Sequence, residues 1–325
     1  MIKTYLGAAL IAATAFGGAS AQDRAGWPES FTVATASQGG TFFVYGSGYA
    51  NLIADQLKLS GAGEVTGGPM QNMALVHTGE AAFGMTTMGP ANESINGTNP
   101  IAPGVKLDNA CAMFPMYKTP FAVSALTSSG IKSVSDIPKG ARIGFGPAGS
   151  TSDTYFPAMM TELGVDYDRR NGSWNDLGSQ LQDGLLDVVA FAVGVPTPAV
   201  SQLEVQTEMN FIEFTADEQA KILAKFPVAD FTIPAATYST LNNDLRSVSM
   251  WNFGIANCDL AESFVYEATN VIMSDNARMM GIHKAAKETV FENWDKNKVL
   301  MWHPGAARWF NENGATIPAN EIHGG

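Results

Sequence analysis

Basic residues are scarce in this sequence. It has 19 lysines and arginines against 31 aspartates and glutamates, which gives a formal net charge of −12 at pH 7. Nucleic acids and acidic membrane surfaces bind proteins through clusters of basic residues, so the composition disfavours both kinds of partner. It does not exclude a small anionic ligand, because a pocket can be locally positive on an acidic protein.

Long apolar runs are also missing beyond the first residues, so no transmembrane anchor of about 20 residues is expected. The first residues show the three parts of a signal peptide: Lys3, an apolar core over residues 6–16, and the small residues Ala19 and Ala21 before a cleavage site. We expect residues 1–21 to be removed and the mature chain to be periplasmic. Lys3 is the only charge in that segment, so its loss changes the net charge from −12 to −13.

Only two cysteines are present, Cys111 and Cys258. In an exported chain such a pair is more often bridged than reactive. The spacing leaves open whether they form a disulfide or two buried thiols, and a bridge requires the apolar strands beside them to be neighbours. No CxxC or HExxH pattern occurs and the four histidines are scattered, so the sequence predicts no metal site.

Enzyme motifs are absent as well: there is no G-x-S-x-G elbow, Walker A loop or paired-carboxylate arrangement. Residues 144–149 do match the G-x-G-x-x-G dinucleotide fingerprint. We reject that interpretation because Pro147 stiffens the turn that should wrap a pyrophosphate, and a soluble nicotinamide cofactor is not expected outside the cytoplasm. The sequence therefore predicts no cofactor.

A glycine-rich turn organises what is present. In residues 31–35, Phe31, Val33 and Thr35 alternate with Thr32 and Ala34, as the two faces of a buried strand do. Small residues follow, and apolar residues then recur at helical spacing as far as Leu57. A helix that begins at this turn points unpaired N–H groups and the positive end of its dipole into the turn, which is the geometry of an anion site. The alternative is a plain strand-to-helix connection that binds nothing.

Residues 141–156 repeat this plan of strand, small-residue turn and helix. With 46% hydrophobic residues and about 300 residues after the signal, the chain is long enough for two cores. We predict an α/β protein of two lobes facing each other across a cleft: residues 22–122 and 247–325 form lobe I, and residues 123–246 form lobe II. Two crossing segments make a hinge. A single continuous domain is the alternative.

After the second crossing, apolar residues recur at helical spacing over residues 261–274 and 276–291, so we expect two helices there.

Six short blocks, taken in order, resemble the TAXI subgroup of TRAP-transporter substrate-binding proteins. The first is similar to that family's G-T-G-S-x-G-G-T-Y-Y block, with Thr35, Ser37, Gly39, Gly40 and Thr41 matching. The blocks are residues 34–43, 66–72, 146–150, 194–196, 233–238 and 303–308. Together they extend over nearly all of the mature sequence.

The resemblance implies a type II periplasmic-binding-protein fold, no catalysis, and delivery of an organic anion to a TRAP membrane permease. Family members are associated with glutamate, glutamine or 2-oxoglutarate. The sequence departs from the family at Phe42 and Phe43, where tyrosines are usual, and at Pro69, where serine is usual. Three hydroxyls are thus missing from the expected pocket walls, which points to a ligand less polar than glutamate or to a carboxylate held differently.

The resemblance and the turn geometry together give the candidate ligand-binding residues. They are Ser37, Gly39, Gly40, Thr41, Phe42, Phe43, Pro69, Met70, Asn72, Thr86, Gly149, Ser150, Thr151, Gly194 and Pro196. We expect Asn72 to be the main polar contact, because an amide both donates and accepts hydrogen bonds. The structural alternatives are that the glycines serve the turns, the phenylalanines fill the core and the hydroxyls cap helices.

Two other functions use the same sequence features: an exported enzyme, or a sensor-coupled binding protein, working through the same cleft. No nucleophile, base and orienting group can be assembled from motifs, which favours binding over catalysis. A secreted surface or adhesion protein is a third possibility, and it predicts no stabilisation by small molecules.

Overall fold

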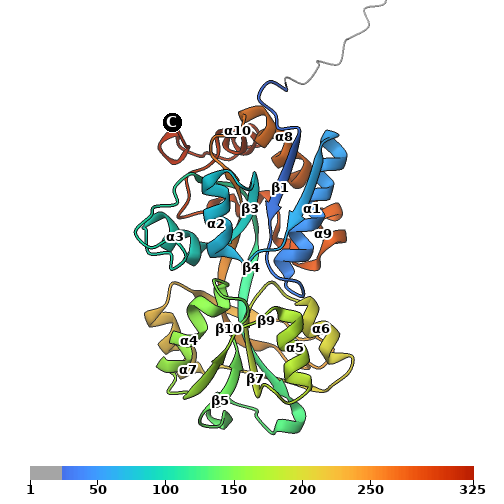
Figure 1. Cartoon of the computed structure of the whole chain (residues 1–325), viewed down its shortest axis with the longest axis vertical. Helices are drawn as coiled ribbons and strands as arrows, with labels where there is room; N and C mark the ends of the chain where they lie inside the picture. Colours follow the sequence, from blue (N-terminus) through green and yellow to red (C-terminus); the bar gives the residue numbers. More distant parts are fainter. Residues whose placement is uncertain (1–23) are drawn as a thin grey trace, which may run out of the picture.

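The structure, a computed structural model, describes residues 24–325, so the predicted signal peptide lies outside the described residues. No helix in this range is long and apolar enough to cross a membrane. Figure 1 shows two α/β halves, one above the other, joined by long strands at the centre. The predicted two-lobed α/β architecture is confirmed.

The upper half is built from strand-helix units in which parallel strands are covered by helices. Its elements before the crossing are β1 (Ser30–Ala34), α1 (Thr41–Leu57), β2 (Ser60–Glu64), α2 (Pro69–Thr78), β3 (Phe83–Thr87) and α3 (Met88–Ile95). Strand β1 pairs in parallel with both β2 and β3. The parallel arrangement places the carboxyl ends of β1 and β3, and so the helices that follow them, at one edge of the sheet.

The lower half repeats this arrangement with β5 between β6 and β7, all parallel. Its elements are β5 (Ala141–Gly144), α4 (Thr151–Glu162), β6 (Tyr167–Arg170), α5 (Trp174–Gln182), β7 (Val188–Ala192), α6 (Pro198–Glu204), β8 (Met209–Ile212), α7 (Ala216–Lys225) and β9 (Ala229–Ile233). Short 3₁₀ turns at Thr127–Ser129 and Val134–Asp136 lead into β5.

Two long antiparallel strands connect the halves: β4 (Ala110–Leu126) runs down and β10 (Leu245–Asn257) runs back. The strand order β2-β1-β3-β10-β4-β7-β5-β6 places this pair at the middle of the path. One buried core contains residues from 31–117 and 253–317, and two others contain residues from 121–250. The boundaries predicted at 122/123 and 246/247 fall inside the same two strands and stay a prediction.

After β10 the chain returns to the upper half as α8 (Glu262–Met273), α9 (Asn276–Ile282) and α10 (Pro304–Glu312). The helix predicted over 276–291 is wrong in its length, because α9 ends at Ile282. The chain then forms 3₁₀ turns at Lys284–Glu288 and Phe291–Lys296, and a last one at Ala319–Glu321. His283 redirects the chain: its backbone is extended and its Nδ1 accepts the N–H of Ala285 at 3.1 Å.

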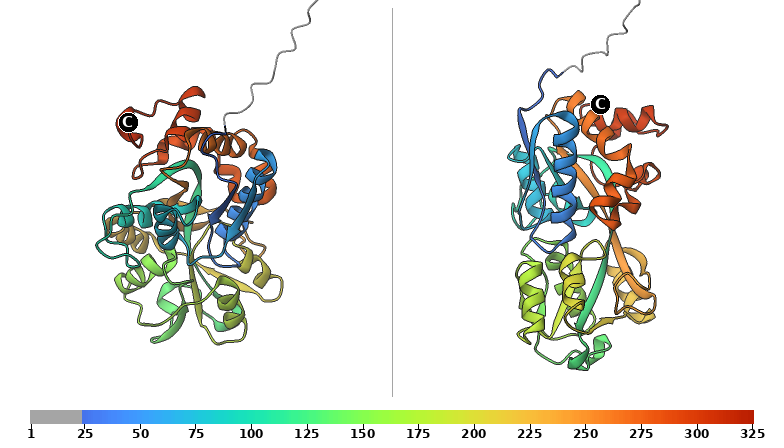
Figure 2. Two further views of the ribbon diagram at one scale, coloured as in Figure 1. Left: turned by 45° about the horizontal axis from the view of Figure 1, so that its top comes forward. Right: turned by 90° about the vertical axis from the view of Figure 1, so that its right-hand side faces the viewer.

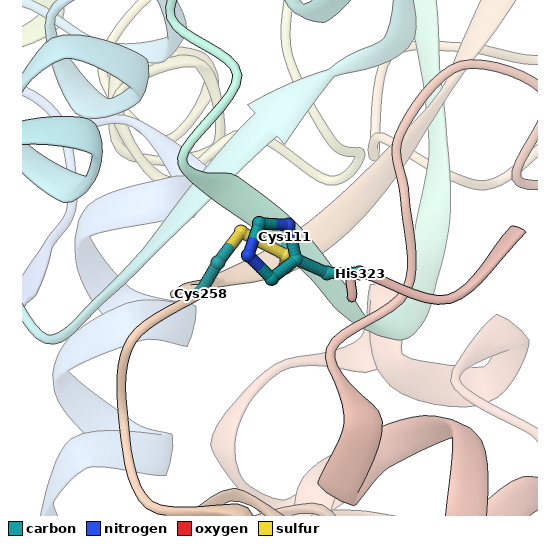
Figure 3. A group of neighbouring side chains, drawn as sticks. All are labelled: Cys111, Cys258 and His323. Carbon is teal, nitrogen blue, oxygen red and sulfur yellow. A yellow bond between two sulfur atoms is a disulfide. The ribbon is translucent and has the colours of Figure 1, made fainter. Parts of the chain in front are cut away.

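Cys111 and Cys258 form a disulfide, with Cα atoms 5.3 Å apart. The condition set by the sequence is met, because Cys111 in β4 pairs with Ala256 near the end of the neighbouring β10. Figure 3 shows the ring of His323 beside the two sulfurs. Since the sulfurs are bonded to each other, they are not thiolates that could hold a metal with this histidine.

His303 begins α10 with its side chain fully buried. Its Nδ1 accepts the N–H of Gly305 at 3.1 Å, so Nε2 carries the proton and donates to the carbonyl oxygen of Leu260 at 3.2 Å. Burial lowers the pKa of His303 from 6.5 to about 4, because a charged ring would lose its hydration. The ring is therefore neutral in the folded protein at neutral pH.

This histidine should make the stability of the protein depend on pH. Between pH 6.5 and 4 the unfolded chain binds a proton that the folded chain does not, so the free energy of unfolding should fall as the pH is lowered, by up to about 3 kcal/mol. In His303→Asn, which keeps a capping side chain, this part of the pH dependence should vanish. Urea unfolding of both proteins at pH 7, 5.5 and 4 measures the difference. If the free energy of unfolding depended on pH equally in both proteins, the assignment to His303 would be contradicted.

Candidate functional site

A small cavity lies between the two halves of the molecule. Its walls are Ala36, Gly40, Thr41, Phe42, Pro69, Thr87, Thr119, Ser150, Thr151, Trp174, Ala192 and Val193. Its volume is about 30 Å³, well below the roughly 300 to 1,000 Å³ of a typical ligand pocket. The lobes are therefore nearly closed upon it.

Four helices, α1 to α4, begin at this cavity, and Trp174, the first residue of a fifth, α5, also lines it. Thr41 and Pro69 are the first residues of α1 and α2, Thr87 is the N-cap of α3, and Ser150 is the N-cap of α4. No side chain caps α1, α2 or α3. Each helix directs first-turn N–H groups and the positive end of its dipole toward its N-terminus, so the ends of α1, α2 and α3 favour an anion in the cavity. At the end of α4, Oδ2 of Asp153 accepts the N–H of Gly149 at 3.0 Å, and its negative charge offsets part of that helix's dipole.

The two glycine turns recognised in the sequence lie on opposite sides of the cavity. Gly39 and Gly149 have φ of +82° and +81°, a left-handed conformation that glycine adopts without strain. Gly40 has an ordinary φ of −91° but no space beside it. A Cβ atom there would lie 2.8 Å from Cδ1 of Trp174, which belongs to the other lobe. A side chain at position 40 would keep the two lobes from approaching as closely as they do.

A chain of hydrogen bonds crosses the cavity wall and ends in the hinge. The Thr87 hydroxyl donates to Oδ1 of Asn252 at 2.8 Å and lies 2.9 Å from the Thr151 hydroxyl, which must then donate to Thr87. Nδ2 of Asn252 donates to the hydroxyl oxygen of Thr119 at 2.7 Å and to the carbonyl oxygen of Tyr117 at 2.8 Å. Asn252 in β10 thus positions two cavity hydroxyls and, through Thr87, a third.

Other polar contacts also join the lobes near the cavity. Thr41 donates its hydroxyl to the carbonyl oxygen of Gly194. At the edge of the interface, the Tyr155 hydroxyl donates to Oε1 of Glu93 at 2.8 Å. Burial raises the pKa of Glu93 despite that hydrogen bond. These contacts hold the lobes in a closed arrangement.

Comparison with known proteins agrees with this geometry. The model of the NMT1-like family matches residues 33–314, most of the chain. The chain belongs to the NMT1-like family.

Solved structures related to this NMT1-like protein share its fold. MatC from Rhodopseudomonas palustris, solved with bound malate, superposes with a TM-score of 0.59 at 15% identity, over 88% of this chain and 99% of that one. The periplasmic binding protein BugD gives a TM-score of 0.58 at 14% identity, over 89% and 99% of the two chains. At these identities the likeness shows the two-lobed binding-protein fold.

The structure brings six of the predicted site residues of this NMT1-like protein to the cavity wall: Gly40, Thr41, Phe42, Pro69, Ser150 and Thr151. Five more predicted residues are each next to a lining residue in the sequence: Ser37, Gly39, Met70, Thr86 and Gly149. Among the described residues, Oγ of Ser37 is one of a few buried side-chain oxygens without a hydrogen-bond partner. The carbonyl oxygen of Gly194 accepts the hydroxyl of Thr41 and does not line the cavity. Phe43 is only half-buried, and Pro196 lines a different groove.

Six lining residues of the NMT1-like protein were missed: Ala36, Thr87, Thr119, Trp174, Ala192 and Val193. Thr87 could have been found, because it also stands where a buried strand ends and a helix begins. Trp174 opens α5 far along the chain from either glycine turn, and only the approach of the lobes brings it to Gly40. Local patterns carry no signal for such a contact.

Asn72, the predicted main polar contact, does not line the cavity. Its Nδ2 donates to the carbonyl oxygens of Thr35 at 2.7 Å and Met85 at 2.8 Å, and its Oδ1 accepts the hydroxyl of Thr66 at 2.6 Å. The side chain is fully buried. Its amide therefore joins the residue after β1 to the middle of β3 and has little capacity left for a ligand.

We expect Asn72→Ala to lower stability rather than affinity alone. It would remove the donor to two buried carbonyls and the acceptor of the Thr66 hydroxyl, which should reduce the free energy of unfolding by about 2 to 4 kcal/mol. Urea unfolding measures this, with Asn96→Ala as a control, because the exposed Asn96 bonds only within its own helix end. A variant that keeps parental stability but loses ligand binding would restore Asn72 as a ligand contact.

Proposed function

We propose that the chain is a periplasmic substrate-binding protein that captures a small organic carboxylate between its lobes and delivers it to a TRAP transporter membrane permease. The observation that carries the capture of an anion is the convergence of four helix N-termini on one interlobe cavity. A carboxylate placed there meets several N–H donors and the positive ends of the helix dipoles.

Free hydroxyl hydrogens support the same ligand class. The oxygen of Thr119 accepts from Asn252, and within residues 24–325 its own hydrogen has no acceptor, so it is available to a ligand oxygen. The buried, unpartnered Ser37 hydroxyl follows the lining residue Ala36. Charge-assisted hydrogen bonds from such groups to a carboxylate are worth about 1.5 to 3 kcal/mol each.

The remaining walls favour one carboxylate on an apolar body. Of the twelve residues that line the cavity, none is acidic to pair with an ammonium, and none is lysine or arginine to pair with a second carboxylate. Phe42, Trp174 and Val193 supply apolar surface instead. Phe42 and Pro69, two of the three departures from the TAXI pattern, are both lining residues. We therefore favour an aliphatic or aromatic monocarboxylate over glutamate, glutamine or 2-oxoglutarate.

Binding requires the lobes to move. The cavity volume of about 30 Å³ is far below that of a ligand pocket, so a ligand enters when the lobes separate, and the lobes close around it less tightly than they do here. The strands β4 and β10 are the two crossings about which such a movement would occur.

Transport is favoured over catalysis by the chemistry of the wall. The hydroxyls of Thr41, Ser150 and Thr151 have no histidine, lysine or carboxylate beside them among the lining residues, so none has a base to activate it. MatC, a structural neighbour, holds malate. The TRAP permease as the partner is supported by the six sequence blocks that resemble the TAXI subgroup.

A ligand panel tests the proposed substrate class. Butyrate or benzoate should raise the melting temperature of the mature protein more than glutamate, glutamine or 2-oxoglutarate at equal concentration. At about 100 times the dissociation constant the gain should approach 2.7 kcal/mol. Butylamine has a similar size and the opposite charge, so it should give no shift in the same differential scanning fluorimetry. Equal stabilisation by butylamine, or none by any acid, would refute the carboxylate assignment.

Gly40→Val tests whether lobe closure at the cavity is needed for binding. The branched side chain would displace Trp174, so affinity for the best acid of the panel should fall at least about tenfold. The unliganded protein should melt within a few degrees of the parent, because the φ of −91° suits valine. Gly281→Val, where a side chain meets nothing within 4 Å, is the matched control and should bind normally. Parental affinity in Gly40→Val would place the site elsewhere.

A further inference from the structure

A second and larger hollow, which we call the lysine groove, lies between the lobes. It holds about 580 Å³, within the range of pockets for small molecules. Its lining residues are Lys118, Val195, Pro196, Phe231, Thr232, Pro234, Ala235, Ala236, Thr237, Met280, Lys284, Ala285, Lys287 and Glu288. None of them lines the small cavity described above.

The groove lies on the opposite face of β4 from that cavity. Neighbouring residues of a strand point to opposite faces, and Thr119 lines the cavity whereas Lys118 lines the groove. The segments that form the two walls, residues 280–288 of the upper lobe and 231–237 of the lower lobe, lie on one side of the molecule, as the right-hand view of Figure 2 shows in orange-red and gold. His283 joins the walls, since its Nε2 donates to the carbonyl oxygen of Pro196 at 3.0 Å.

The groove is positively charged on an acidic protein. Three lysines and one glutamate give it a formal charge of +2, whereas the whole chain carries −12. Glu288 is fully engaged by Lys118, accepting its Nζ at 2.9 Å and its backbone N–H at 2.9 Å. Lys284 and Lys287 are exposed, and within the described residues neither forms a salt bridge. Two cationic groups are therefore free to meet an anion.

The other walls are apolar and fixed. Nζ of Lys118 lies 5.4 Å from the ring centroid of Phe231 and 5.1 Å from that of Trp251, so both rings make cation–π contacts with it. The loop that contains Ala236 is held by backbone hydrogen bonds, from Ala235 to Oδ1 of Asp244 at 2.8 Å and from Ala236 to the carbonyl of Leu241 at 2.9 Å. An apolar hollow at a domain interface with a few charged groups has the properties of a small-molecule site.

We propose that the lysine groove is a second ligand site, for a small organic anion whose apolar body packs against Phe231 and Pro234 while its acidic group pairs with Lys284 and Lys287. The inference is independent of the carboxylate proposed for the interlobe cavity, because the two sets of lining residues do not overlap. Sulfonates and carboxylates share the required chemistry, so either serves as a probe.

Titration with 8-anilinonaphthalene-1-sulfonate, followed by fluorescence, tests the proposal on the mature protein. We expect saturable binding at one site, weakened by added salt. Lys284→Glu/Lys287→Glu should lower the affinity about tenfold or more, and Lys284→Arg/Lys287→Arg should retain it. Lys132→Glu/Lys139→Glu makes the same charge change on exposed residues outside the groove and is the control.

The outcomes separate this site from others. Gly40→Val should still bind the dye, because neither Gly40 nor Trp174 lines the groove. The proposal is overturned if the dye does not saturate, if the Lys284/Lys287 glutamate variant binds like the parent, or if the control pair loses as much affinity. A loss caused by Gly40→Val alone would assign the dye to the interlobe cavity and equally overturn the proposal.

Discussion

The pairing of β4 with β10 is the interaction on which the rest of the structure depends. The two strands run antiparallel from the disulfide end of the upper lobe to the middle of the lower one, with a shift of register between Trp251 and Phe253. Asn252 stands at that irregularity and bonds to both neighbouring strands, through Thr87 of β3 and Thr119 of β4. A buried amide satisfied in this way fixes the position of hydroxyls that could otherwise rotate freely.

This hinge explains why the electropositive cavity and the lysine groove lie so close together yet remain distinct. Successive side chains of β4 face opposite sides, so a single strand contributes Thr119 to one hollow and Lys118 to the other. In the cavity the positive potential comes from helix ends, so the residues that line it carry no charged side chain. In the groove it comes from lysines, one of which is already neutralised by Glu288.

Local patterns predicted much of the fold. The alternation around Val33 and the glycine turn after it located β1 and α1, and the repeat around Gly144 located β5 and α4, because strand period and turn chemistry are properties of neighbouring residues. The extent of α9 could not be read in this way: residues beyond Ile282 keep helical spacing, but the His283 side chain bonds to Ala285 and to Pro196 of the other lobe. Tertiary contacts override propensity there.

The candidate site was predictable only in part for the same reason. Helix N-termini after strands could be located, and so Thr41 and Ser150 were identified. Trp174 and Val193 reach the cavity through the packing of one lobe on the other, which no spacing encodes. Asn72 has a side chain suited to either a ligand or the backbone, and only the positions of Thr35 and Met85 show that the backbone is its partner.

The most direct test of the central claim, that four helix ends enclose a carboxylate, is to identify what the protein carries. The protein, purified gently without added ligand, should be analysed by native mass spectrometry with release and fragmentation of the bound molecule. The account predicts a small organic acid with one carboxylate and no cationic group, bound one to one. A bound molecule that has no acidic group would contradict it.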